Sequence, residues 1–254
     1  MLLSNSNSKL LAERLKTGAE EVFGNQSERN AMVQAMRSGK SPMDTEGGEK
    51  LKNLAMGLIF AGPGAKTANL LKLNVARRME EAGAKPEDIL LKTGWFKGME
   101  GKWKFEIPDD ASRFSTGPLT GGKTVPVTEV LDHKALYDAY PYLRSMKAQP
   151  MPPDVPQGAI GMFEGPANPG GMMSLAPKAR RDTALHEMQH AIQEQEGFAV
   201  GGGYEIPDMY RRLAGEIESR NVQSRMMMSP QGRLNRPPWT TQDIPPDQAI
   251  VRTP

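Results

Sequence analysis

Two of the three histidines in the chain lie four residues apart, within the stretch RDTALHEMQHAIQEQEGFA at residues 181–199. On a helix, where successive residues are about 100° apart, His190 lies about 40° from His186 and Glu187 lies about 100° from it. Both imidazoles and the carboxylate then share one arc of the helix surface. Two histidines on adjacent turns, with a glutamate after the first, form the H-E-x-x-H pattern of zinc hydrolases.

This pattern predicts zinc-dependent amide hydrolysis. His186 and His190 would hold the ion, and Glu187 would act as the general base toward a zinc-bound water. Zinc lowers the pKa of that water to about 7 and polarises a carbonyl oxygen, so it supplies both the nucleophile and the electrophile. Apolar residues around the motif predict that the helix is buried: Ala184, Leu185, Met188, Ala191 and Ile192. The competing interpretation is an ordinary helix that carries two histidines.

A catalytic zinc ion usually has three protein ligands, so a third ligand must come from another segment. The chain has no cysteine, which leaves His133 or a carboxylate. His133 is more typical of a helix N-terminus than of a ligand. The stretch MYRRLAGEIESRNVQSR at residues 209–225 predicts a second helix, which offers Glu216 and Glu218. These two lie about 200° apart, and each lies about 100° from the apolar stripe of the helix, so periodicity does not choose between them.

Other residues near the motif have weaker functional interpretations. Tyr204 and Tyr210 are candidates to donate a hydrogen bond to the oxyanion, although a simple packed tyrosine is the competing interpretation. The three glycines at residues 201–203 predict either a mobile lid or a flexible surface link. The stretch GGMMSLAP at residues 170–177 could be an edge strand that pairs with an extended peptide, or an edge strand without that role.

The helices and strands that must position these residues are expected to form an α+β domain over residues 67–228. Helices are expected over 67–84, 85–95, 133–140, 179–196 and 207–228, and strands over 101–107, 158–165 and 170–177. In the first strand, Trp103 and Phe105 alternate with Lys102 and Lys104, which is typical of a strand with one buried face.

The segments on either side of this domain have a different character. Residues 1–66 predict a helical, partly mobile leader. Within it the apolar run LAMGLIFAGPGA at residues 54–65 is shorter than the roughly 20 residues needed to span a bilayer, so it predicts a buried or docking segment. Residues 229–254 are rich in proline and predict an extended tail.

Composition narrows the classes of partner and compartment. The formal net charge of +2, from 32 basic and 30 acidic residues, lacks the basic excess that marks nucleic-acid-binding proteins. Without cysteine, disulfides and thiolate metal sites are excluded. The N-terminal stretch MLLSNSNSKLLAERLK is polar where a secretory signal needs its apolar core. We therefore expect no nucleic-acid partner, no signal peptide and no transmembrane segment.

Four spaced blocks carry a family resemblance: TGWFKGMEGKWKFEI, LDHKALYDAYPYL, LHEMQHAIQEQEGFA and YRRLAGEIESRNVQSR. Together they are similar to a zincin-like module among the large polyvalent protein-associated domains of phages and mobile elements, over about residues 67–240. The motif with its second glutamate helix also looks like the gluzincin branch of zinc metallopeptidases. The resemblance implies a zincin-like fold, in which a small mixed sheet packs on the helix that carries the motif.

The resemblance also implies roles for individual residues. His186 and His190 fall on the zinc ligands, and Glu187 falls on the general base. Glu216 falls where gluzincins place their third ligand, four residues before an aspartate. Arg220 stands at that aspartate position, which keeps Glu218 as the alternative ligand and leaves the partner that orients a zinc histidine undefined.

Three functions follow as expectations. The first is a phage-encoded zinc metallopeptidase that hydrolyses an extended polypeptide substrate. The second is a virion structural or assembly protein that keeps the zincin scaffold without activity, and the third is an amidase of cell-wall peptide. The expected location is the phage virion or the cytoplasm of the bacterial host, and residues 1–66 are the candidate contact to capsid, portal or tail proteins.

Overall fold

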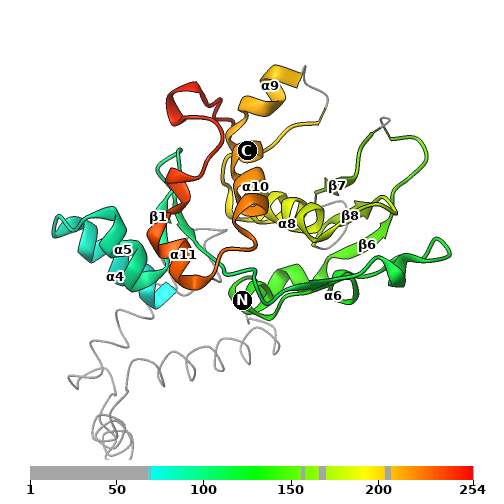
Figure 1. The fold of residues 1–254 in the computed structure, drawn as a ribbon, viewed down its shortest axis with the longest axis horizontal. Helices are drawn as coiled ribbons and strands as arrows, with labels where there is room; N and C mark the ends of the chain where they lie inside the picture. Colours follow the sequence, from blue (N-terminus) through cyan, green and yellow to red (C-terminus); the bar gives the residue numbers. More distant parts are fainter. Residues whose placement is uncertain (1–67, 69, 156–157, 166–169, 204–206, 254) are drawn as a thin grey trace, which may run out of the picture. The chain divides into compact units, whose positions relative to one another are not determined.

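The computed structural model describes residue 68 and residues 70–155, 158–165, 170–203 and 207–253 (Figure 1). The chain divides into two compact units, residues 1–62 and 63–254. The predicted leader, its apolar run and Tyr204 lie outside the described residues. Within the described part of the chain, no helix has the length and apolar character that crossing a membrane requires.

The described unit is an α+β structure, as the sequence predicts. Its helices are α4 Leu70–Glu81, α5 Pro86–Thr93, α6 Val127–Val130, α7 Lys134–Ala139, α8 Arg181–Glu196, α9 Pro207–Arg212, α10 Ala214–Arg225 and α11 Pro230–Asn235. Its strands are β1 Trp95–Lys97, β2 Trp103–Phe105, β3 Arg113–Phe114, β4 Val125–Pro126, β5 Leu131–Asp132, β6 Lys147–Pro150, β7 Gly161–Glu164 and β8 Met172–Leu175. Short 3-10 turns lie at Gly117–Leu119, Pro141–Ser145, Pro238–Thr240 and Pro246–Gln248.

Local signals set the ends of several helices. Gly83, which follows α4, and Gly94, which ends α5, both have positive φ, and Pro86 lies in the first turn of α5. Gly197 ends α8 in the same left-handed conformation. These helices therefore lie where the sequence predicts them.

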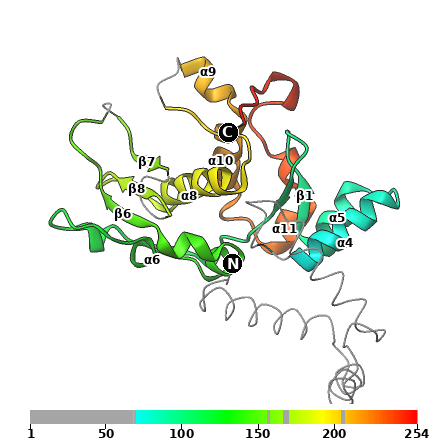
Figure 2. The ribbon, with the colours of Figure 1, turned by 180° about the vertical axis from the view of Figure 1, so that it is seen from behind.

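The largest sheet is mixed, with the strand order β4-β6-β8-β7. Strand β6 pairs with β8 in parallel, whereas the other two pairs are antiparallel. Among the described strands, β8 is therefore interior and β7 lies at the edge. The expectation that residues 170–177 form an edge strand is wrong, because β6 returns from a distant part of the chain to cover the second side of β8. Helix α8 lies between this sheet and α10 (Figures 1 and 2).

The single helix expected over residues 207–228 is interrupted at Leu213. There the chain is extended, with φ −62° and ψ 129°, and forms a parallel bridge with Ile250. The Ile250 N–H donates to Arg212 O at 2.7 Å, and the Ala214 N–H donates to Ile250 O at 2.9 Å. Ile250, which lies 36 or more residues along the chain, thus replaces the helical hydrogen bonds at this point. No local sequence pattern predicts such a distant partner.

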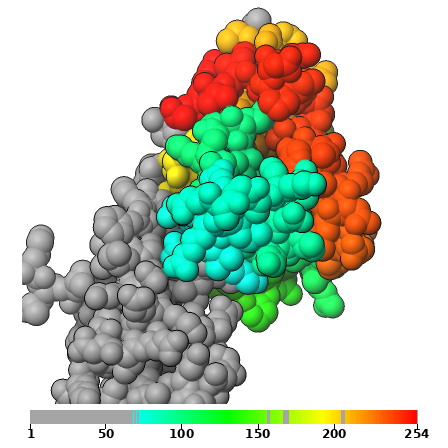
Figure 3. Space-filling view, turned by 90° about the vertical axis from the view of Figure 1, so that its left-hand side faces the viewer, coloured from blue at the N-terminus to red at the C-terminus, as the bar shows by residue number. Residues whose placement is uncertain are grey.

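The prediction of an extended tail over residues 229–254 also differs from the structure. This segment contains α11 and lies beside α4 and α5 (Figure 3). Arg233 forms ion pairs with Glu106 at 2.9 Å and Asp109 at 2.8 Å, and Trp239 lies against Phe96 with ring centroids 6.3 Å apart. The buried Arg233 guanidinium therefore anchors the segment to the domain.

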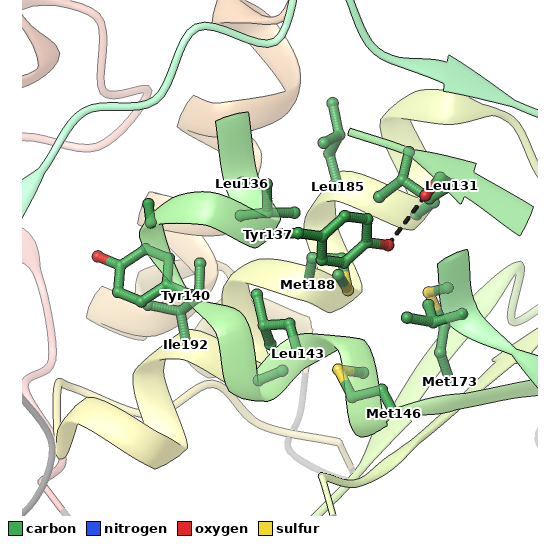
Figure 4. Close-up of a cluster of buried hydrophobic side chains, with 14 of the residues drawn as sticks. Leu131, Leu136, Tyr137, Tyr140, Leu143, Met146, Met173, Leu185, Met188 and Ile192 are labelled. Atoms are coloured by element: carbon green, nitrogen blue, oxygen red, sulfur yellow. Dashed lines mark hydrogen bonds between the residues drawn. The ribbon is translucent and has the colours of Figure 1, made fainter. Parts of the chain in front are cut away.

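The hydrophobic core lies under one face of α8 (Figure 4). By helical spacing, His186 and His190 point away from this face. Leu185, Met188 and Ile192 recur along this face and contact residues of α7 and the turn after it. Leu143, in that turn, is fully buried. Tyr137 places its ring in the core and donates its hydroxyl proton to Leu131 O at 2.9 Å. The core thus holds α8 in one rotation about its axis.

Replacing Leu143 by alanine should lower the free energy of unfolding by about 2–5 kcal/mol, because the substitution leaves a cavity in the core. Chemical denaturation measures this change. The matched control is Leu91→Ala, at a leucine that is 61% exposed, where we expect a change within about 0.5 kcal/mol. Equal effects of the two substitutions would contradict the position of the core.

Candidate metal centre

Helices α8 and α10 bring the motif together with a buried carboxylate. His186 Nε2 lies 3.3 Å from Glu216 Oε2, and His190 Nε2 lies 3.3 Å from Glu216 Oε1. One potential ligand atom from each of the three residues lies within 4.8 Å of the other two. The structure therefore gathers His186, His190 and Glu216 into a group of two nitrogens and one carboxylate.

The Glu216 carboxylate suits a cation. Its side chain has no solvent exposure, and its Oε2 makes no hydrogen bond within the described part of the chain. A buried carboxylate oxygen without a donor is costly, so it usually has an ion or a water as its partner. Two imidazoles and one carboxylate are a donor set that zinc accepts in catalytic sites. The residues present therefore fit a zinc ion.

Glycine 201 shapes one wall of this group. A Cβ at this position would overlap Glu216 Oε1 and His190 Cε1. The neighbouring Gly202 N–H donates to Glu216 Oε1 at 3.0 Å. Gly215 permits this approach, since a Cβ there would overlap the backbone of residues 200 and 201. The loop predicted as a lid or a link therefore contacts the candidate ligands themselves.

A glutamine lies behind each histidine. His190 Nδ1 is 2.9 Å from Gln193 Oε1, and His186 Nδ1 is 3.2 Å from Gln223 Oε1. An acceptor at Nδ1 favours a proton on that nitrogen and leaves the Nε2 lone pair free toward Glu216. Neither glutamine is among the candidate residues that the sequence predicts. Each lies seven residues after a candidate ligand on its own helix, and that spacing of about two turns could have revealed them.

Glu187 lies beneath the edge strand β7. Its side chain is buried, and a Cβ on Gly161 would collide with Glu187 Oε1, so the glycine leaves space for the carboxylate. Burial raises the pKa of Glu187 to about 7, and the nearby Glu216 charge adds to this effect. His186 and the Phe163 N–H oppose the rise. A carboxyl group with this pKa can both accept and release a proton near neutral pH.

The alternative ligand Glu218 faces away from the histidines. Its Oε1 is paired with Lys104 Nζ, and its Oε2 accepts from Gln193 Nε2 at 3.3 Å. Lys104 is itself buried, although the alternation along its strand predicts that it is exposed. The reason is that α10 packs against this side of β2 and places the Glu218 carboxylate beside the ammonium group. Burial raises the pKa of Glu218, and the Lys104 ammonium group opposes that rise.

The other candidates have separate contacts. His133 caps α7 by accepting the Leu136 N–H, and its Nε2 lies 2.9 Å from Asp109 Oδ1, so it does not join the group. The Arg220 guanidinium group pairs with both oxygens of Asp243 and not with Glu216. Tyr210 lies near Glu216, and burial, together with this carboxylate, raises the pKa of its hydroxyl group. Of the two tyrosine candidates, Tyr210 is therefore the one that the described residues place beside the group.

The three gathered residues influence one another electrostatically. Burial alone would raise the pKa of Glu216, but His186, His190, Tyr210 and the Gly202 N–H outweigh it and lower this pKa. Burial lowers the pKa of His190. For His186 the Glu216 and Glu187 carboxylates outweigh burial, so its pKa is raised.

Comparison with known proteins gives one match. A family model described as large polyvalent protein associated domain 23 matches residues 58–115. In the described part of the chain this range covers α4, α5 and β1 to β3, and it includes Lys104 but none of the three gathered residues. The match is consistent with a phage or mobile-element context. Searches of curated proteins and of solved structures found no significant match.

Replacing Gly201 by alanine should weaken zinc binding about tenfold or more, because the added Cβ would push His190 and Glu216 apart. Competitive titration with a zinc chelator measures the affinity. Gly203→Ala is the matched control from the same loop, since, apart from its chain neighbours, no heavy atom of the described residues lies within 4 Å of a Cβ there. Equal zinc affinities of the two variants would contradict the close contact of residue 201 with His190 and Glu216.

The pKa of Glu187 predicts a pH effect on the stability of the zinc-free protein. A folded pKa of about 7, above the ordinary 4.5, means that folding favours the protonated carboxyl group. This contribution is present at low pH and is lost as the pH rises from about 4.5 through about 7.

Glu187→Gln mimics the protonated group, so its free energy of unfolding, relative to the unsubstituted protein, should rise between pH 4 and pH 8. The expected rise is up to about 3 kcal/mol. Chemical denaturation with a chelator present measures it, and Glu129→Gln, at an exposed carboxylate, is the control. A difference that does not vary with pH would contradict the assigned pKa.

Proposed function

We propose that the chain is a zinc-dependent metallopeptidase with a zincin-like fold of the gluzincin type, encoded by a phage or mobile element. The observation that carries this proposal is the gathering of His186 and His190 around the fully buried Glu216 carboxylate. The match to a large polyvalent protein domain supports the context. The motif, the raised pKa of Glu187 and the edge strand above it support the reaction.

The ligand set in this proposal is His186 Nε2, His190 Nε2 and one oxygen of Glu216. A zinc ion held there supplies a Lewis acid for the scissile carbonyl group and lowers the pKa of a water molecule. The Gly202 N–H and the two glutamines hold the three side chains in place. Three protein ligands held in this way would suit a catalytic zinc ion, which needs room for a water molecule or substrate beside them.

Glu187 performs the proton transfers. Its carboxylate takes a proton from the attacking water as the oxygen bonds to the carbonyl carbon. It then gives this proton to the amide nitrogen as the C–N bond breaks, so that a carboxylic acid and an amine form. The acid loses its remaining proton to the amine or to solvent and leaves as a carboxylate. Tyr210, which lies near Glu216, is the candidate donor to the oxyanion. An extended polypeptide can pair with the outer edge of β7, which runs beside Glu187.

One observation favours the second candidate, a virion structural or assembly protein that keeps this scaffold. The side chains of His186 and His190 are only 12% and 14% exposed, which limits access for a substrate. In that role the metal would stabilise the fold. The contact of residues 1–66 with capsid, portal or tail proteins stays a prediction in either case.

Metal analysis with activity assays tests the proposal. The purified protein should hold one zinc per chain, and His186→Ala should lose it. Glu187→Gln should keep the zinc, while hydrolysis of denatured proteins falls about 10²–10⁴-fold. A parallel assay on peptidoglycan separates a peptidase from a cell-wall amidase. A protein that cannot be loaded with zinc would exclude the site, and zinc binding without hydrolysis of either substrate would favour the scaffold role.

A further inference from the structure

A continuous row of buried polar groups runs from His190 to strand β2. Gln193 has no solvent exposure, and Glu218 and Lys104 are 7% and 5% exposed. Gln193 Oε1 lies 2.9 Å from His190 Nδ1, and Gln193 Nε2 lies 2.8 Å from Gly215 O and 3.3 Å from Glu218 Oε2. Buried polar side chains are costly unless each group has a partner, and the Gln193 amide has partners on both sides.

The chemistry of these partners fixes the orientation of the Gln193 amide. The Gly215 carbonyl oxygen can only accept a hydrogen bond, so the amide NH₂ group must face it. The Gln193 carbonyl oxygen then faces His190 and can only accept. His190 must therefore carry its proton on Nδ1, and its Nε2 lone pair points toward Glu216. Ser219 Oγ, the other described neighbour of Nδ1, is farther away at 3.5 Å.

Lys104 holds the far end of this row. Its ammonium group pairs with Glu218 and, at 2.7 Å, with Glu100, whose Oε1 also accepts the Ala199 N–H at 3.2 Å. The Phe198 ring lies 4.7 Å from Lys104 Nζ and closes the group from another side. Without this ammonium group, two buried carboxylates would face each other. The Glu218 carboxylate is thereby held against Gln193 Nε2.

We propose that Gln193 is a positioning residue that fixes both the ring orientation and the tautomer of His190, and that Glu218 and Lys104 fix Gln193. The segment that matches the polyvalent-protein domain then contributes to the candidate metal centre through Lys104, although it supplies no ligand. This inference rests on the proposed metal site and does not depend on whether the site hydrolyses peptides.

The test begins with the zinc-free protein at pH 8.5, where long-range ¹H–¹⁵N correlation spectra report which nitrogen of each histidine carries the proton. His190 should be protonated on Nδ1. Gln193→Met keeps the length of the side chain but removes its acceptor, so the Nε2-protonated form of His190 should appear. Gln193→Glu keeps an acceptor and should retain the Nδ1-protonated form. Gln195→Leu, at an exposed glutamine of the same helix, is the control.

The second measurement is metal affinity. Gln193→Met should weaken zinc binding about 10–100-fold and change the visible spectrum of the cobalt-substituted protein, whereas Gln195→Leu should change neither. Unchanged tautomer and affinity in Gln193→Met would overturn the inference, as would an Nε2-protonated His190 in the unsubstituted protein. If Gln193→Met does not fold, an Nε2-protonated His190 in Gln193→Glu would equally overturn it. Failure of the unsubstituted protein to bind zinc, or to cut peptides, would instead count against the proposed function.

Discussion

The close approach of α8 to α10 is the constraint on which the candidate site depends. Glu216 is fully buried between two imidazoles, and a carboxylate in that position requires donors or a cation. Gly215 lets the chain at residue 201 pass directly over the start of α10, which brings the Gly202 N–H to the carboxylate. A larger side chain at Gly215 would push the chain at residue 201 away from α10, and one at Gly201 would push His190 and Glu216 apart.

The surroundings of the site come from distant parts of the chain and are joined by buried charges. Lys104 links the β1–β2 hairpin to α10, Arg225 of α10 pairs with Glu106, and Arg233 links the C-terminal segment to the same carboxylate. Buried ion pairs add little net stability, because desolvation offsets much of their attraction. Their main consequence here is geometric, since each pair has a preferred arrangement that fixes one segment against another. The described part of the region that matches the polyvalent-protein domain is therefore joined to α10, the helix that carries Glu216.

Much of the fold was predictable because its signals are local. Glycines with positive φ and a proline in the first turn bound α4 and α5, and the strands β7 and β8 follow from short apolar runs around a turn. The parallel pairing of β6 with β8 and the break at Leu213 were not predictable. Both depend on strands or bridges formed by residues far apart in the chain, and no local pattern encodes such a partner.

The sequence by itself determined that His186, Glu187 and His190 share one face of a helix, because helical geometry fixes their angles. It also limited the third group to a histidine or a carboxylate, since the chain has no cysteine. Only the tertiary structure decided that Glu216 faces the histidines and Glu218 does not. The two are equivalent in helical periodicity and both are buried, but Lys104, 114 residues before Glu218, pairs with one of them and leaves the other to the imidazoles. That choice depends on a charge from another element, which the helix sequence does not contain.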